Sequence, residues 1–96
     1  LALMAPTAVL VNTSRGPIVE EAALLEALRE KRIAGAALDV YWKEPLPPDH
    51  PLRSLDNVLL TPHIGFVTAE NLAKMYPAAV EDIIAFLDGK PIRVLG

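Results

Sequence analysis

Three residues of types that carry out acid–base chemistry lie far apart in the sequence, each after a short apolar run. Arg15 follows the first run, Glu44 lies in a proline-rich stretch after the second, and His63 follows the third. A histidine exchanges a proton near neutral pH, a carboxylate holds the charged imidazolium, and an arginine binds a substrate carboxylate through two parallel hydrogen bonds. Brought together by folding, these side chains would form a site for proton transfer on an organic acid.

The apolar pattern around these residues predicts an α/β fold with a parallel sheet. Short apolar runs at 8–11, 36–40 and 58–60 are typical of buried strands. We expect the first of them to be buried on both faces, because it holds four consecutive apolar residues. Strands that alternate with helical segments indicate parallel pairing.

Two segments have apolar residues at helical spacing. The first covers residues 20–32, with acidic residues in its first turn and basic residues in its last. The second is expected to begin after an N-cap at Thr68 and to end at a C-cap at Gly89. Pro77 lies inside it and predicts a kink or a short break just before the proline, because proline removes a backbone donor. An extended tail is expected over 91–96.

The proline-rich loop between the second and third strands is expected to lack regular structure, since prolines cluster at positions 45–51. We expect His50 in this loop to be a surface residue. Tyr41 and Trp42, at the start of the loop, are expected to be packing residues beside the site.

The strand order predicts that the candidate residues converge. In an open parallel sheet the strands end on one edge, and ligands bind in the crevice beyond those carboxyl ends. Residues 12–16 follow the first strand, Asp39 and Glu44 end or follow the second, and His63 follows the third. Arg15, Glu44 and His63 are therefore expected on one rim of the sheet.

Composition limits the class of protein and its partners. The chain has 96 residues, 52% of them hydrophobic, and its 9 basic and 12 acidic residues give a net charge of −3. These values are typical of one small folded domain without a basic surface for nucleic acid or anionic lipid. The absence of cysteine excludes disulfides and thiolate metal ligands. We expect a soluble, cytoplasmic protein with no nucleic-acid partner, no membrane partner and no metal site.

Three motifs occur in a fixed order and cover nearly the whole chain. They are AVLVNTSRGPIVE at 8–20, AGAALDVY at 34–41 followed by Glu44-Pro45, and NVLLTPHIG at 57–65. Together they closely resemble the NAD(P)-dependent D-isomer-specific 2-hydroxyacid dehydrogenases. The resemblance implies part of a Rossmann-like parallel sheet with flanking helices, NAD or NADP as cofactor, and a 2-hydroxy or 2-keto acid as substrate.

The same resemblance assigns roles to individual residues. It implies that Arg15 binds the carboxylate and carbonyl of the substrate, that His63 is the general acid and base, and that Glu44 supports His63. It further implies that Asp39 contacts the nicotinamide carboxamide, with Thr13 and Gly65 as neighbours at the backbone. Capping of a neighbouring turn is a structural alternative for Asp39.

The resemblance also implies how the chain is organised. Residues 1–66 correspond to the C-terminal half of a nicotinamide-cofactor-binding domain, and residues 67–96 to a helix and tail that return toward a substrate domain. The sequence contains no Gly-x-Gly-x-x-Gly phosphate loop. Phe66 replaces a glycine found in many members, and Glu20 replaces the commoner aspartate. We therefore expect a fragment of a longer, homo-oligomeric enzyme, inactive by itself.

Two alternatives remain open at this point. The chain could belong to a non-catalytic relative that senses nucleotides or binds proteins, as the corepressor branch of the same family does. It could also persist as a self-associating structural fragment. Hydride transfer by the complete protein would distinguish the enzyme from both.

Overall fold

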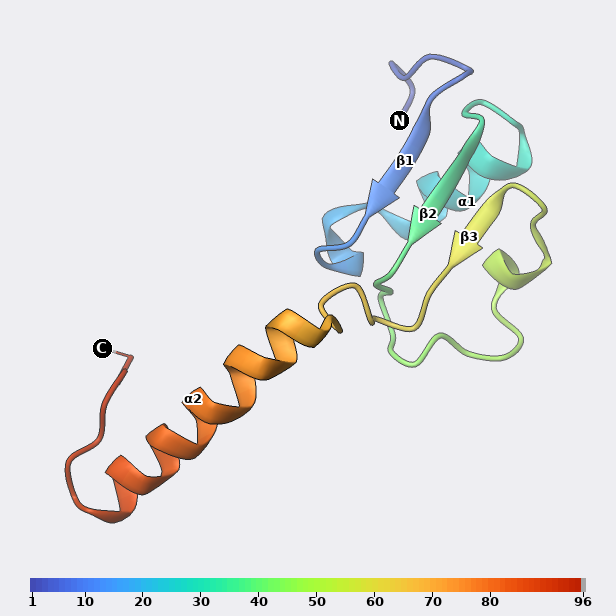
Figure 1. The fold of residues 1–96 in the computed structure, drawn as a ribbon. Coiled ribbons are helices and arrows are strands. Elements are labelled where there is room, and N and C mark those ends of the chain that lie inside the picture. Colours follow the sequence, from blue (N-terminus) through green and yellow to red (C-terminus); the bar gives the residue numbers. More distant parts are fainter. Residues whose placement is uncertain (96) are drawn as a thin grey trace. The chain divides into compact units, whose positions relative to one another are not determined.

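The computed structural model describes residues 1–95. They fall into two compact units, one of residues 1–65 and one that begins at Phe66. The first unit contains a sheet of β1 (Val9–Asn12), β2 (Gly35–Leu38) and β3 (Val58–Leu60) in the order β1-β2-β3. Both pairs are parallel, with Ala36 opposite Leu10 on one side and opposite Val58 on the other. All three arrowheads in Figure 1 therefore point the same way. The predicted α/β fold with a parallel sheet is confirmed.

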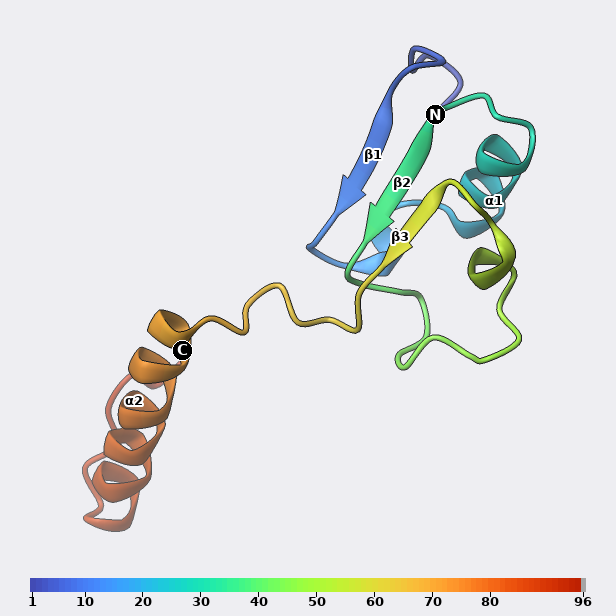
Figure 2. The ribbon, with the colours of Figure 1, turned by 45° about the vertical axis from the view of Figure 1, so that its right-hand side comes forward.

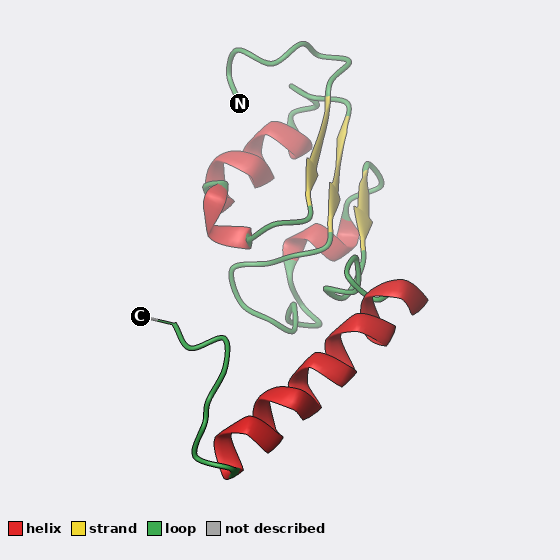
Figure 3. Cartoon of the chain, turned by 60° about the vertical axis from the view of Figure 1, so that its left-hand side comes forward, coloured by secondary structure: helices red, strands yellow, loops and turns green. Residues whose placement is uncertain are grey.

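The sheet is covered on one face only among the described residues. Leu10 packs against the core, whereas Val9 and Val11 are 57% and 66% exposed. Because successive side chains of a strand point to opposite faces, the prediction that the first strand is buried on both faces is wrong. Four apolar residues in a row are compatible with burial on both faces, but among the described residues nothing buries Val9 and Val11. Helix α1 (Glu21–Arg29) and the short 3-10 helix η2 (Pro51–Ser54) lie on the covered face (Figure 3).

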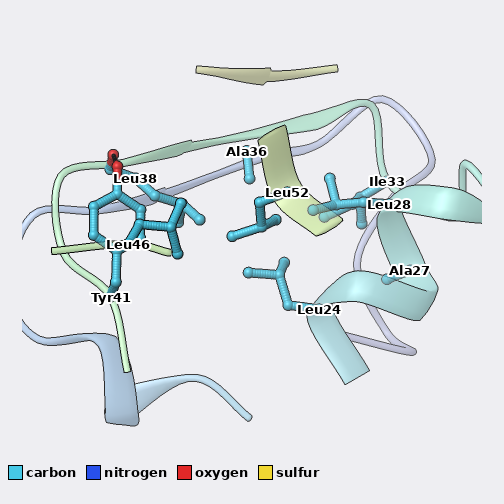
Figure 4. Close-up of a cluster of buried hydrophobic side chains, with 9 residues drawn as sticks. All are labelled: Leu24, Ala27, Leu28, Ile33, Ala36, Leu38, Tyr41, Leu46 and Leu52. Carbon is cyan, nitrogen blue, oxygen red and sulfur yellow. Dashed lines mark hydrogen bonds between the residues drawn. The ribbon is translucent and has the colours of Figure 1, made fainter. Parts of the chain in front are cut away.

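The core lies between the sheet and α1. Its most deeply buried side chains come from the helix, the turn after it and η2, and Ala36 and Leu38 of β2 close it from above, as Figure 4 shows. The cluster consists of Leu24, Ala27, Leu28, Ile33, Ala36, Leu38, Tyr41, Leu46 and Leu52. Burial of these side chains at about 25 cal/mol per Å² is the main force that holds the sheet edge in place.

Helix α1 is shorter than the predicted 20–32. Glu20 lies before it as N-cap, and its carboxylate accepts from the amides of Ala22 and Ala23 at 3.1 and 2.6 Å. Lys31, at φ 54°, ends the helix, so that its amide bonds to Leu28 and the next amide bonds to Ala27. Glu20, where aspartate is commoner in the family that the sequence resembles, is thus a working N-cap.

The proline-rich loop is more regular than predicted. His50 caps η2, since its Nδ1 accepts from the Leu52 amide at 3.2 Å, and its Nε2 lies 2.8 Å from Glu21. Only 12% of the His50 side chain is exposed, so the prediction of a surface residue is wrong. A second 3-10 helix, η1 (Gly16–Ile18), follows the loop after β1.

The second unit contains α2 (Ala69–Leu87), which Thr68 caps as predicted by accepting from the Asn71 amide at 3.1 Å. The helix continues through Pro77, so of the predicted kink or break the break is wrong. This helix is exposed, so water can satisfy the carbonyl that proline leaves without a donor. The C-cap is Asp88, and Gly89, predicted as the C-cap, is the next residue and ends the helix in a left-handed conformation at φ 70°.

The tail after α2 differs from the predicted extended segment. Its Arg93 pairs with Glu81 and Asp82 of α2 at 2.8 and 2.6 Å, so the chain turns back along the helix (Figure 2). Gly96, the last residue of that prediction, lies outside the described residues.

No helix within residues 1–95 combines the length and apolar character needed to cross a membrane.

Candidate active site

The loop after β1 is held by its own first residue. The buried Asn12 accepts from the Ser14 amide at 3.0 Å and donates to the Arg15 carbonyl at 2.9 Å. Thr13 and Arg15 are therefore presented outward on a closed turn, and both side chains are exposed. Sequence reasoning did not select Asn12, although an asparagine side chain commonly bonds to the backbone two residues further on and so closes a turn.

Gly16 lets this loop approach the segment that follows β2. A Cβ at position 16 would lie 2.1 Å from the backbone carbonyl carbon of Tyr41, so no side chain fits there. Trp42 adds a second tie, since its indole N–H donates to the Val19 carbonyl at 2.7 Å. The Arg15 loop is thereby fixed beside the segment that carries Glu44. Tyr41 and Trp42 pack beside the site, as predicted.

Glu44 and His63 form the centre of the site. Nδ1 of His63 lies 2.6 Å from one carboxylate oxygen of Glu44, and the other oxygen accepts from the Tyr41 amide at 2.9 Å. The bond with His63 does most to lower the pKa of Glu44, the Tyr41 amide lowers it further, and the charge of Arg15 contributes. The structure therefore brings Glu44 and His63 into contact and places Arg15 near enough for its charge to act on Glu44.

Asp39, at the end of β2, bonds to the segment that carries His63. One oxygen accepts from the Thr61 hydroxyl at 2.5 Å and the Ile64 amide at 3.0 Å, and the other accepts from the Gly65 amide at 2.8 Å. These three bonds, the Thr61 hydroxyl first, lower the pKa of Asp39 although its side chain is buried. Asp39 therefore caps the turn at residues 63–65, which is the structural alternative predicted for it.

A cavity of about 600 Å³ opens beside the Glu44–His63 pair. Besides the pair, it is lined by Tyr41, Pro45, Leu46, Arg53, Leu60, Thr61 and Pro62. The guanidinium of Arg53 is fixed by bonds to the Pro47 and Leu46 carbonyls at 2.8 and 2.7 Å. Sequence reasoning missed Arg53, because nothing in the loop's composition predicts which residue faces a cavity.

Thr13, Asp39 and Gly65, which the resemblance assigns to the cofactor, lie beyond the carboxyl ends of the three strands. Open parallel sheets bind dinucleotides at this edge. Asp39 uses three of the roughly four acceptor positions of a carboxylate. One acceptor position is left, which fits the amide donor of a nicotinamide carboxamide. Over residues 1–95, no three His, Asp or Glu side chains are grouped as metal ligands are.

A parallel sheet with a Glu44–His63 pair beyond its carboxyl ends is the arrangement that the resemblance to a dehydrogenase cofactor domain implies. Residues 1–65 match the sequence model of the family described as D-isomer specific 2-hydroxyacid dehydrogenase, NAD binding domain. The chain belongs to this family.

Individual proteins support the same assignment. The chain is 53% identical over 87 residues to glyoxylate reductase of Thermofilum pendens, which covers 91% of this chain and 26% of that protein. The structure resembles a D-isomer specific 2-hydroxyacid dehydrogenase from Xanthobacter autotrophicus Py2, with TM-score 0.81, 43% identity and coverage of 94% and 29%. It also resembles the acyclic imino acid reductase Bsp5 in complex with NADPH and D-Arg, with TM-score 0.82, 38% identity and coverage of 100% and 30%.

The chain thus spans about a quarter of the length of the curated relative that it matches.

Proposed function

We propose that the complete protein is an NAD(P)-dependent oxidoreductase that interconverts D-2-hydroxy acids and 2-keto acids. The observation that carries this proposal is the 2.6 Å contact between Glu44 and His63 at the carboxyl edge of the sheet, in a chain of this family. The similarity to a glyoxylate reductase favours glyoxylate as the first substrate to test.

His63 is proposed as the general acid and base. A nicotinamide cofactor, when bound, supplies or accepts the hydride at C2 of the acid. His63 gives a proton to the carbonyl oxygen during reduction and takes it from the hydroxyl during oxidation. Glu44 accepts from Nδ1 of the imidazole, which fixes the ring's orientation and balances the charge of the imidazolium.

Arg15 is proposed to bind the substrate carboxylate. Its backbone is fixed by Asn12, and its guanidinium, exposed and on the loop beside Glu44, donates to the Ser14 carbonyl at 2.6 Å. A planar guanidinium can also bond to a carboxylate through two parallel N–H groups. The same charge would polarise the neighbouring carbonyl for hydride attack.

Thr13, Asp39 and Gly65 are proposed to hold the nicotinamide end of the cofactor. We further propose that residues 1–66 are the C-terminal half of the cofactor domain, that residues 67–96 lead toward a substrate domain, and that the complete protein is a homo-oligomer. The 96-residue chain alone is expected to be inactive, since its sequence holds no phosphate loop to bind the pyrophosphate.

The test uses protein expressed from the complete reading frame that encodes this chain. It should oxidise NADH or NADPH when glyoxylate is supplied, and His63→Ala should reduce turnover by about 10²- to 10⁴-fold. His50→Gln, which alters the other histidine of residues 1–96, is the matched control and should retain activity. Binding of NADH without turnover of any 2-keto acid would instead identify a nucleotide-sensing relative.

A further inference from the structure

We infer that Asp39 is a positioning residue for His63, because its carboxylate holds the backbone on both sides of that histidine. The inference rests on the proposed role of His63 as general acid and base. It assigns Asp39 an effect on the chemical step that is separate from any contact with the cofactor.

The contacts of Asp39 enclose His63 in the sequence. Thr61 lies two residues before the histidine and bonds through its hydroxyl, whereas Ile64 and Gly65 follow it and bond through their amides. A single carboxylate therefore fixes three points of a five-residue segment. The anchor is rigid, because the Asp39 amide donates to the Asn12 carbonyl at 3.0 Å and so extends the pairing of β2 with β1.

The segment requires such an anchor. His63 has φ 57°, a left-handed backbone conformation that costs a residue with a Cβ roughly 1 to 2 kcal/mol. Residues in such conformations persist only where surrounding contacts impose them. With His63 in the left-handed conformation, the Ile64 and Gly65 amides donate to Asp39. These two bonds and the Thr61 bond offset the cost of that conformation.

Gly65 shows how closely the segment and the carboxylate approach. A Cβ at position 65 would lie 3.0 Å from the carboxylate oxygen that accepts from the Gly65 amide. A larger residue would push the amide away from Asp39. The glycine thus serves the contact with Asp39, in addition to any contact that the cofactor makes there.

The imidazole is consequently fixed at two levels. Glu44 fixes the ring through Nδ1, and Asp39 fixes the direction in which the ring leaves the backbone. The side chains of Glu44 and His63 are each more than a third exposed. If the backbone segment were released, their mutual contact alone would not stop the pair from moving as one body. Displacement of a catalytic group by about 1 Å can lower the rate about 100-fold, so replacement of Asp39 should lower turnover.

The first arm of the test is NMR on the complete protein with selectively labelled histidine, comparing Asp39→Asn with wild type. Asparagine has the same shape but lacks the charge and one acceptor. In wild type, the positive φ of His63 should give a strong NOE between its own amide and Hα protons. Its Nδ1 resonance should be shifted from that of a solvent-exposed histidine by the bond with Glu44. Asp39→Asn should weaken both signals, whereas Asp56→Asn, at an exposed aspartate, should leave both unchanged. Unchanged His63 signals in Asp39→Asn would overturn the inference.

The second arm is kinetic and uses the complete protein at saturating NADH. Asp39→Asn should lower kcat for keto-acid reduction by about ten- to a hundredfold. A rise in the KM for NADH with kcat unchanged would mean that Asp39 serves only the cofactor, and would overturn the inference. Absence of activity in wild type would refute the proposed function, and the NMR arm would then decide the role of Asp39.

A second pair of variants decides the matter if Asp39→Asn does not fold. Thr61→Val removes one of the three donors without changing side-chain shape, and Thr61→Ser keeps the hydroxyl. The His63 signals should change in Thr61→Val and return in Thr61→Ser. Wild-type His63 signals in a folded Thr61→Val would overturn the inference.

Discussion

Glu44 and His63, nineteen residues apart in the sequence, meet at 2.6 Å, and the remaining oxygen of Glu44 is held by the Tyr41 amide. The pair is therefore connected to β3 through His63 and to the segment after β2 through Tyr41. A contact of this kind couples the proposed chemistry to the stability of the sheet edge, and the coupling can be measured by changing pH.

Acidification should destabilise the first unit through Glu44 and Asp39. The pKa of each is lowered in the folded chain, Glu44 chiefly by His63 and Asp39 chiefly by Thr61. A lowered pKa gives stability that is present above the unfolded value, about 4 for these groups, and is lost as pH falls through the folded value. Thermal unfolding from pH 7 to pH 3 should therefore show a smaller loss of Tm in Glu44→Gln than in wild type.

Glu70→Gln is the control for this experiment, because Glu70 is an exposed residue of α2 in the other unit. It should follow the wild-type pH dependence of the transition in the first unit. A parallel pH dependence of wild type and Glu44→Gln would contradict the prediction.

Arg15→Lys should separate substrate binding from cofactor binding in the complete protein. Lysine keeps the charge but loses the planar pair of N–H donors, and a charge-assisted hydrogen bond is worth about 1.5 to 3 kcal/mol. We expect kcat/KM for the keto acid to fall about tenfold or more, through both a higher KM and a slower turnover, with the KM for NADH little changed. Arg29→Lys, on the exposed end of α1, should behave as wild type. An effect confined to NADH would make the carboxylate assignment of Arg15 wrong.

Gly16→Ala should destabilise the first unit more than its small volume suggests. The added methyl would lie 2.1 Å from the Tyr41 backbone, so the Arg15 loop must move away, at a cost of about 1 to 3 kcal/mol. Trp42, the only tryptophan, lies at this contact and reports the transition by fluorescence. Gly89→Ala, in the second unit, should leave the Trp42 transition unchanged. A wild-type Tm for Gly16→Ala would show that the loop yields freely.

Local patterns in the sequence predict much of this fold. The three strands lie within about two residues of their expected positions, because each apolar run is bounded by polar or turn-forming residues. Thr68 caps the start of α2 as predicted, and Gly89 lies one residue beyond its C-cap, since capping depends on one residue and its immediate neighbours. The sequence also places Glu44 and His63 on one rim of the sheet, because parallel strands have their carboxyl ends at one edge, and the structure brings the two into contact.

Contacts that depend on the register of distant segments are not predictable in this way. The bonds of Asp39 join residues 22 to 26 positions apart, and His50 meets Glu21 across 29 positions. Burial of β1 depends on what packs against each of its faces, which its own residues do not encode. Residue type alone predicts a capping role as an alternative for Asp39, but it does not predict the partners Thr61, Ile64 and Gly65.

The 96-residue chain is expected to self-associate in solution. Within the described residues, α2 exposes large apolar side chains around Ile83, and the edge strand β1 exposes Val9 and Val11. Unpaired strand edges and apolar helix faces both favour contact with a second copy. Covering a few hundred Å² at about 25 cal/mol per Å² contributes several kcal/mol, which is comparable to the stability of a small domain. Light scattering over a dilution series should therefore give an apparent mass that falls as the chain is diluted.

Ile83→Lys should lower the apparent mass at each concentration, because burial of a lysine in an apolar contact is costly. Asn71→Lys introduces the same charge on α2 at an exposed position that is already polar, and it should leave the mass unchanged. A monomer of constant mass at every concentration, with one sharp thermal transition, would show that the exposed side chains of α2 need no partner. A mass that responds to Ile83→Lys but not to Asn71→Lys would place a contact on the apolar face of α2.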